Sequence, residues 1–341
     1  MPLKILIAGG YGVVGGILAR LIREVSADVE LVLAGRHPQS DEALSLARQL
    51  GGARTVQLDL DKPAPFQEIS LSDFDLIVSA LLDPADRLEY AAVEHKLAYI
   101  GFSRLADQTV PSLIAAVHAP PERPLALFGH WVAGGITMFV KSLAADFKEL
   151  QTIELAAVYD PRDPIGPTVA NEQNSGELTA RSLLRRDGVW IWGEAGEERH
   201  ARQITALQGQ VVTGTPMAVL DLPSLSNMTK ASNIRFDLAT GESAGTSAGK
   251  AASHEVYMDL QGTLLCGTRA RKRFVLSDPN GQAHLTALGV LVAVERILGL
   301  DGSPPAAGGV HFPETLLNEQ HVRNRFEQFG VRLFPFEEVK K

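Results

Sequence analysis

The chain has 341 residues, 45% of them hydrophobic and 21% charged, a composition typical of a globular protein with one large or two ordinary domains. Its formal net charge of −8, with no basic tail, argues against nucleic acid as a partner. The single cysteine excludes an internal disulfide, the nine histidines show no metal-ligand spacing, and no apolar run reaches membrane-spanning length. We therefore expect no metal and no membrane contact. We also expect a cytoplasmic location, because the first predicted strand begins at residue 3 and leaves no room for a signal peptide.

The first 25 residues predict a strand, a glycine turn and a helix. Residues 3–8 (LKILIA) are an apolar strand, and residues 17–25 carry apolar side chains at helical spacing. Between them Gly10, Gly12 and Gly15 form a G-x-G-x-x-G motif, which in this context indicates a dinucleotide site. Gly10 would make the turn, Gly12 would let a pyrophosphate approach the helix N-terminus, and Gly15 would let helix pack on strand. The alternative is a tight strand-to-helix turn that binds nothing.

The chain up to residue 128 continues to alternate strands and helices. Predicted strands cover residues 29–34, 54–58, 75–81, 97–102 and 125–128, and predicted helices cover 41–50 and 84–96. This pattern favours an α/β fold with a doubly wound parallel sheet of the Rossmann type, in which ligands bind beyond the carboxyl ends of the strands. The strand ends that we expect at this edge are Gly9–Val14, Gly35–Arg36, Asp59, Ser79–Leu82 (with Ala80 and Leu81), Gly101–Arg104 (with Ser103) and Gly129–Gly134 (with His130).

The pattern changes after residue 128. A predicted helix over 135–150 is followed by short strand-like segments with few helices, which favours an inserted α+β domain with a mostly antiparallel sheet. We expect residues 1–128 to form the dinucleotide-binding domain and residues 129–276 to form the substrate and dimerisation domain. The segment 277–341 is too apolar for a free tail, so we expect it to return to the first domain. Cys266 is expected to pack as a small buried hydrophobe.

The end of the second strand predicts the choice of cofactor. NAD-binding folds usually carry an acidic residue there, about 20 residues after the glycine motif. This chain has Arg36, which can bind the 2′-phosphate of NADP through charge-assisted hydrogen bonds. Gly35 would leave space for that phosphate, and Ser40 can donate a further bond. The alternative interpretation is that Arg36 is an ordinary surface arginine. We expect the cofactor to be NADP(H).

The motifs together resemble the saccharopine dehydrogenase family in its broad sense, which includes saccharopine reductase-like oxidoreductases. The stretches that carry the resemblance are GGYGVVG (9–15), LAGR (33–36), DLIVSAL (75–81), YIGFSR (99–104), DLPSL (221–225), GVHFPETLL (309–317) and FEQFGVRLF (326–334). The resemblance implies an NADP(H)-binding Rossmann domain closed by the C-terminal segment, an inserted α+β domain and a homodimer. The cofactor contacts that it implies are Gly10, Tyr11, Gly12, Val13, Val14, Arg36, Ser79 and Ala80. GHWVAGG (129–135) replaces the family's GFDPG-like motif, which argues against the usual amino-acid substrate.

The predicted function is an NADP(H)-dependent oxidoreductase that transfers a hydride to or from a small carbonyl, imine or enone. A nicotinamide enzyme must move one proton, and His130 is the first candidate for that catalytic role because imidazole titrates near neutral pH. The other candidates are Asp83, Ser103, Tyr159 and Asp160, while Arg162 and Asn171 can bind a substrate carboxylate. The alternative function is a redox-silent NADP-binding sensor or scaffold, since a fold does not prove catalysis.

Overall fold

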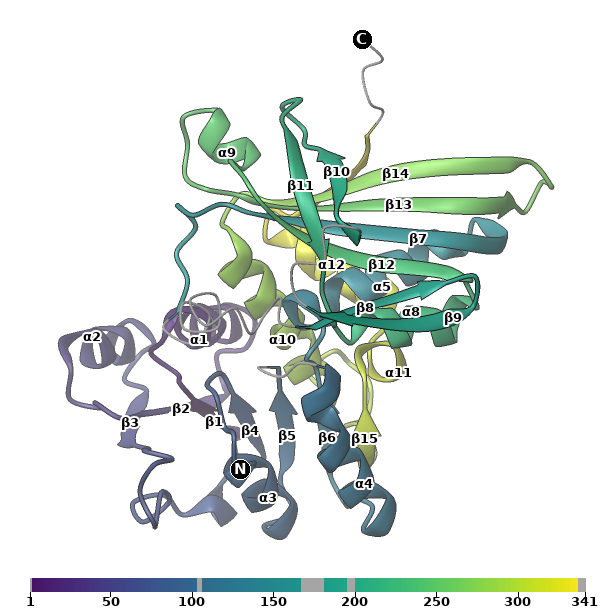
Figure 1. Cartoon of the computed structure of the whole chain (residues 1–341). Helices are drawn as coiled ribbons and strands as arrows, with labels where there is room; N and C mark the ends of the chain where they lie inside the picture. Colours follow the sequence, from purple (N-terminus) through teal and green to yellow (C-terminus); the bar gives the residue numbers. More distant parts are fainter. Residues whose placement is uncertain (1, 103–105, 167–180, 195–199, 337–341) are drawn as a thin grey trace. The chain divides into compact units, whose positions relative to one another are not determined.

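The computed structural model describes residues 2–102, 106–166, 181–194 and 200–336 (Figure 1). The chain divides into two compact units. Unit 1 contains residues 1–129 and 286–317, and unit 2 contains residues 130–285 and 318–341. In the described part of the chain, no helix is both long and apolar enough to cross a membrane.

Unit 1 is built on a seven-stranded parallel sheet with the order β15-β6-β5-β4-β1-β2-β3, which Figure 1 shows side by side. Its strands are β1 (Lys4–Ala8), β2 (Glu30–Gly35), β3 (Arg54–Gln57), β4 (Leu76–Ser79), β5 (Ala98–Gly101), β6 (Pro124–Leu127) and β15 (Gly309–His311). Its helices are α1 (Val13–Val25), α2 (Asp41–Gln49), α3 (Arg87–Glu94), α4 (Val110–His118) and α11 (Pro313–Leu316), with 3₁₀ turns at Leu71–Asp73 and Ala106–Thr109. The expected doubly wound sheet is confirmed, and the strand order reverses between β1 and β4.

Both faces of the unit 1 sheet are covered, which explains its apolar strands. Residues 5–8 of β1 are completely buried. Because side chains alternate along a strand, Leu6 and Ala8 point to one face, where they share a core cluster with Leu88 and Ala92 of α3. Strands buried on both faces carry near-continuous hydrophobic runs, as the sequence of β1 does.

Unit 2 contains a mixed sheet in the order β10-β11-β12-β7-β13-β14-β16, and β8 joins β12 to β9 beside this path. Its strands are β7 (Phe147–Tyr159), β8 (Arg181–Arg186), β9 (Val189–Glu194), β10 (Arg202–Thr205), β11 (Val211–Pro216), β12 (Asn233–Thr240), β13 (His254–Leu264), β14 (Arg269–Asp278) and β16 (Arg332–Pro335). Its helices are α5 (Gly135–Ala144), α8 (Asp221–Thr229), α9 (Ala244–Ser247) and α12 (Glu319–Gln328), with a 3₁₀ turn at Trp131–Gly134. Helix α10 (Gln282–Leu298) starts in unit 2 and ends in unit 1. Only the β7–β12 pair in this sheet, as far as it is described, is parallel, so the mostly antiparallel α+β unit is confirmed.

The C-terminal segment differs from the expected division of the chain. Residues 286–317 lie in unit 1, where β15 pairs with β6. Residues 318–336 lie in unit 2 instead: β16 pairs with β14, and the buried ring of Phe326 contacts Phe139 of α5 with a centroid distance of 5.4 Å. An apolar helix face indicates that the helix must be buried but does not identify the surface that buries it.

Two local expectations are corrected by the structure. The helix predicted over 135–150 ends at Ala144, and its last residues belong to β7. Cys266 is exposed rather than buried, because it lies in the turn between β13 and β14 next to Gly267, whose φ is +88°.

The packing of α12 predicts a large stability loss for Phe326→Ala. Phe326 is fully buried, so truncation should lower the free energy of unfolding by about 3–5 kcal/mol. Glu327→Ala changes an exposed neighbour on the same helix and should stay within about 0.5 kcal/mol of the parent. Chemical denaturation of both variants measures the difference. Equal stabilities for the two would contradict the placement of α12 in the core of unit 2.

Candidate cofactor-binding site

The glycine turn after β1 is tied to the strands on both sides. The N–H groups of Gly9 and Gly10 donate to the carbonyl of Ala34 in β2, at 2.8 and 3.2 Å. On the other side the N–H of Ala80, just after β4, donates to the carbonyl of Ala8 at 2.8 Å. The turn therefore lies at the point where the strand order reverses, which is where open α/β sheets bind their ligands.

The absence of a side chain has a different physical role at each of the three glycines of the motif. A Cβ on Gly15 would overlap the carbonyl oxygen of Gly9, and a Cβ on Gly10 would come within 2.7 Å of the carbonyl oxygen of Ile7. Gly12 has an ordinary φ of −74°, is exposed, and its Cβ would meet only the carbonyl oxygen of Gly9, at 3.1 Å. Packing within the chain thus requires Gly10 and Gly15, whereas Gly12 leaves the backbone accessible to a bound group.

The start of α1 is suited to an anion. Its N-cap residue Gly12 provides no side-chain cap, and its first turn contains no acidic residue. The start of α2 is the opposite case: the Ser40 hydroxyl accepts from the N–H of Ala43, and Asp41 and Glu42 occupy the first turn. Since the first N–H groups of a helix lack partners within it and carry partial positive charge, α1 offers its first turn to a negatively charged ligand.

Tyr11 connects the glycine turn to the end of β2. Its hydroxyl oxygen accepts a hydrogen bond from the N–H of His37 at 2.8 Å, and burial raises the pKa of the phenol, so it stays neutral. A Cβ on Gly35 would overlap this hydroxyl. This corrects the role expected for Gly35, because the space beside it holds the Tyr11 ring. Arg36 lies between these two fixed positions and is exposed.

The remaining predicted cofactor residues also lie at this edge of unit 1. Asp59 follows β3 and accepts from the N–H of Asp61 at 3.2 Å. At the end of β4 the buried Ser79 hydroxyl donates to the carbonyl of Leu81 at 3.4 Å. Gly101 ends β5. The predicted residues that the structure brings to the carboxyl edge of this sheet are Gly10, Tyr11, Gly12, Val13, Val14, Gly15, Gly35, Arg36, Asp59, Ser79, Ala80, Leu81 and Gly101. Ser103 lies outside the described residues.

His130, the predicted proton-transfer residue, begins unit 2 and is buried, with 4% of its surface exposed. Its Nε2 lies 2.9 Å from the hydroxyl of Ser224, which belongs to the DLPSL motif on α8. Burial lowers the pKa of His130 to about 3, so the ring is neutral at physiological pH. No local sequence pattern links Ser224 to His130, because the two residues are 94 positions apart.

The turn after His130 is held in an unfavourable backbone conformation. Val132, Ala133 and Gly134 have φ values of 45°, 51° and 82°, and the left-handed region costs roughly 1–2 kcal/mol for each non-glycine residue. The fully buried carboxylate of Asp221 accepts from the N–H of Trp131 at 2.7 Å and from the Thr137 hydroxyl at 2.6 Å. Such strained segments concentrate at functional sites, and no local sequence signal predicts this one.

The other candidate polar residues have structural partners. Asp83 accepts from the N–H of Leu88 at 2.7 Å and so caps α3. Asp160 accepts from the N–H groups of Arg162 and Ser243, at 3.0 and 2.9 Å. The Arg162 side chain lies 3.6 Å from Glu242. Tyr159 is the last residue of β7, and Asn171 lies outside the described residues.

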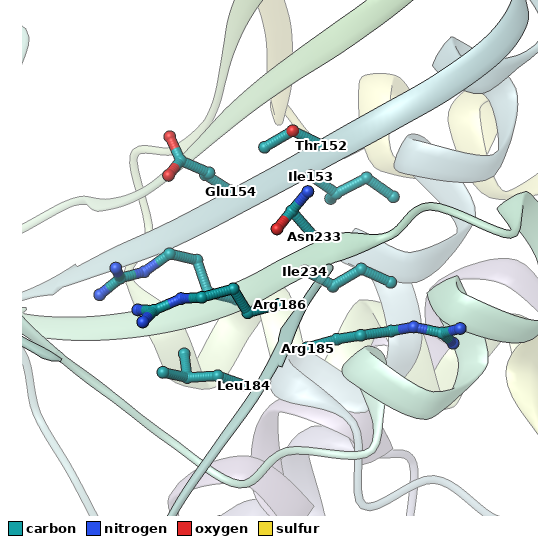
Figure 2. A pocket seen from close by; sticks show the side chains of 9 residues that line it. Thr152, Ile153, Glu154, Leu184, Arg185, Arg186, Asn233 and Ile234 are labelled. Carbon is teal, nitrogen blue, oxygen red and sulfur yellow. The ribbon is translucent and has the colours of Figure 1, made fainter. Parts of the chain in front are cut away.

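Unit 2 also contains a cavity of about 140 Å³ beside β7, β8 and β12 (Figure 2). Arg185, Arg186 and Arg235 contribute to its lining together with Glu154. The guanidinium of Arg235 is bound by both carboxylate oxygens of Asp237, at 2.5 and 2.8 Å. Arg235 is therefore already paired within unit 2, while the three arginines of the lining outnumber its single carboxylate, Glu154.

Comparisons place the chain within a known fold. No protein-family model and no curated protein matches its sequence. Among solved structures it is similar to apo saccharopine dehydrogenase (L-Glu forming) from Saccharomyces cerevisiae, at 12% identity over 99% of this chain and 100% of that chain, with a TM-score of 0.67. Two likenesses are weaker. A substituted meso-dapdh from Clostridium tetani E88 is 11% identical over 96% of this chain and 99% of that chain, with a TM-score of 0.45. A probable aspartate-semialdehyde dehydrogenase from Pseudomonas aeruginosa is 13% identical over 86% of this chain and 98% of that chain, with a TM-score of 0.45.

Only the first of these likenesses is strong enough to define a shared fold. That fold is a doubly wound dinucleotide-binding sheet with a second α+β unit. More particularly, it is the fold of saccharopine dehydrogenase along the whole described chain. The fold implied by the motif resemblance is therefore confirmed.

The different roles of the glycines predict different effects of alanine. Gly15→Ala should lower the free energy of unfolding by about 3 kcal/mol or more, because its methyl group would overlap the Gly9 backbone. Gly12→Ala should cost less than about 1 kcal/mol and weaken the binding of a dinucleotide at least about tenfold. Thermal unfolding and cofactor titration separate the two effects. Unchanged dinucleotide affinity in Gly12→Ala would contradict the site.

The buried histidines predict a loss of stability in acid. Burial lowers the pKa of His254, which accepts from the Trp131 indole N–H at 3.1 Å, to about 4. The unfolded chain binds its proton near the ordinary pKa of 6.5, so this contribution to stability is complete above pH 6.5 and is lost as the pH falls toward 4. Between pH 7 and pH 5 the parent should lose about 2 kcal/mol relative to His254→Gln.

The comparison of two variants removes the contributions of other titrating groups. Asp163, whose pKa burial raises to about 6, titrates in both proteins and cancels in the difference. Chemical denaturation at the two pH values gives the result. A difference in stability that does not change with pH would show that His254 can be protonated in the folded protein.

Proposed function

We propose that the protein is an NADP(H)-dependent oxidoreductase that transfers a hydride to or from a small carbonyl, imine or enone. The observation that carries the proposal is the uncapped start of α1, preceded by a glycine turn at the reversal point of a parallel sheet. The likeness in fold to a protein named as a dehydrogenase supports the proposal.

The residues present fit the cofactor. The backbone N–H groups at the start of α1 would hold the pyrophosphate, and the accessible backbone at Gly12 would let it approach. Arg36 would bind the 2′-phosphate through two parallel charge-assisted hydrogen bonds. The Ser40 hydroxyl already accepts the N–H of Ala43, and its own proton is free to be donated to the same phosphate.

The preference for NADP over NAD is proposed from the charge at the end of β2. Arg36 occupies the position at which an acidic residue would repel a 2′-phosphate. The next acidic residues in the chain, Asp41 and Glu42, come five and six positions later and are the first two residues of α2. The hydrogen bond between Tyr11 and His37 fixes the backbone on the far side of Arg36. This preorganisation reduces the entropy that Arg36 must lose on binding the phosphate.

The nicotinamide supplies the hydride when the cofactor is bound. The chain must then move one proton, and the proposed group remains His130. Because its ring is buried and neutral, it cannot act as an imidazolium acid near pH 7. A neutral imidazole whose Nε2 contacts the Ser224 hydroxyl can instead relay a proton, with one ring nitrogen accepting as the other donates.

The function is tested first by binding and then by turnover. NADPH binding is measured by fluorescence titration, and oxidation of NADPH is followed with a panel of carbonyls, imines and enones. Gly12→Ala serves as the folded control with weakened cofactor binding, so at an NADPH concentration below its dissociation constant its oxidation rate should fall in proportion to the lost affinity. Binding without oxidation by any compound would instead favour the redox-silent sensor or scaffold. Absence of NADPH binding would reject both functions.

Arg36→Ala is expected to weaken NADPH binding by about 1.5–3 kcal/mol, through loss of a charge-assisted contact to the 2′-phosphate. NADH binding should hardly change. Tyr11→Phe should weaken NADPH binding by about 1 kcal/mol in the parent, and by much less in the Arg36→Ala background, because it acts by positioning Arg36. Titration of the four proteins with both cofactors forms the cycle. Equal losses for NADPH and NADH would refute the specificity proposal.

His130→Gln keeps polarity and approximate reach without an imidazole. The proposed relay predicts that NADPH binding survives while turnover of an identified substrate falls by about 10²–10⁴-fold. Because the pKa of His130 is about 3, the parent's rate should show no His130 titration between about pH 5 and pH 9. Turnover within a few-fold of the parent would assign His130 a structural role.

A further inference from the structure

A row of ion pairs crosses one face of the unit 2 sheet, and each member lies 2.5–3.8 Å from the next. In order along the row, the members are Arg235, Asp237, Arg202, Glu154, Arg271, Asp259 and Arg273. Because the row begins and ends with an arginine, one of its positive charges has no carboxylate to balance it. This local excess of positive charge contrasts with the net charge of −8 of the whole chain.

Arg186 of β8 adds a second positive charge at the Arg235 end of the row. The register of the antiparallel β8–β12 pair puts Arg186 diagonally across from Arg235 on the same face, within reach of a long side chain. Arg186 forms no ion pair with any described residue. Figure 2 shows Arg185 pointing away from Arg186, to the other face, where it donates to the Ser226 hydroxyl. Arg186 and Arg235 are therefore neighbouring like charges, and only Arg235 has a carboxylate partner.

Both arginines line the cavity of Figure 2 and keep donors for a ligand. Arg235 uses its Nε and Nη2 on Asp237 and on the carbonyl of His200, so its Nη1 has no partner among the described residues. The side chain of Thr152, which carries a hydroxyl donor, lines the same cavity. The volume of about 140 Å³ is below the roughly 300–1,000 Å³ of sites for drug-sized ligands. The cavity therefore fits one small group.

We propose that this cavity binds a small oxyanion, the carboxylate or phosphate group of a ligand, between the guanidinium groups of Arg186 and Arg235. A guanidinium donates two parallel charge-assisted hydrogen bonds to such a group, and the negative charge relieves the repulsion between the two arginines. The Thr152 hydroxyl donates a further bond. Glu154 also lines the cavity, but its carboxylate is already paired with Arg202 at 3.3 Å. None of these residues belongs to the proposed cofactor site.

Isothermal titration calorimetry of the full chain with inorganic phosphate, and separately with malonate, tests the site at constant ionic strength. The parent should bind one or both anions at one site, and the tighter of the two identifies a phosphate or a carboxylate as the preferred group. Arg186→Gln should weaken this binding at least about tenfold, through loss of a bidentate contact. Arg269→Gln is the matched control, because it removes an exposed arginine of β14 that does not line the cavity, and should change the affinity less than about twofold. Absence of binding by the parent, or equal weakening in the two variants, overturns the proposal.

Two further variants separate a defined site from a general attraction of anions to positive charge. Thr152→Val keeps the shape and the charge but removes a donor, so it should weaken binding about two- to tenfold. Glu154→Gln removes a negative charge from the lining and should strengthen binding about twofold or more. Circular dichroism confirms that each variant is folded. Unchanged affinity in Thr152→Val, or weaker binding in Glu154→Gln, would contradict an oxyanion in this cavity.

Discussion

The close approach of the Gly9–Gly15 turn to the strands on both sides is the constraint on which unit 1 depends. Hydrogen bonds from the turn to Ala34, and from Ala80 to Ala8, fix it between β2 and β4. No side chain larger than hydrogen fits at Gly10 or Gly15 without moving backbone atoms. The same contacts that close the turn direct the start of α1 to the carboxyl edge of the sheet. Folding and the capacity to bind an anion therefore have one structural cause.

Tyr11 extends this constraint to the neighbouring loop. It belongs to the turn, yet its hydroxyl accepts the N–H of His37 and its ring fills the space beside Gly35. The position that would contact the pyrophosphate and the position that would contact the 2′-phosphate are thus connected by one side chain. A binding site whose parts support each other loses less entropy when a ligand binds.

Unit 2 relies on buried polar groups that are neutral or hydrogen-bonded. His130 and His254 are both buried with lowered pKa values, and the carboxylate of Asp221 accepts two short hydrogen bonds. Those bonds hold the start of a turn in which Val132 and Ala133 have positive φ. Burial of a polar group is costly unless it has partners, so these interactions allow only one arrangement of the segment around them.

Local periodicity and residues close together in the chain were enough to predict the first six strands of the unit 1 sheet, the glycine turn and the arginine at the end of β2. The sequence also indicated a mostly antiparallel second unit. Three features are visible only in the folded chain: the surface that buries α12, the contact of Ser224 with His130, and the Tyr11 ring in the space beside Gly35. The physical reason is distance along the chain: an apolar stripe or a polar side chain shows that a partner is needed, whereas the identity of a partner 24 or 94 residues away is fixed only when the chain has folded.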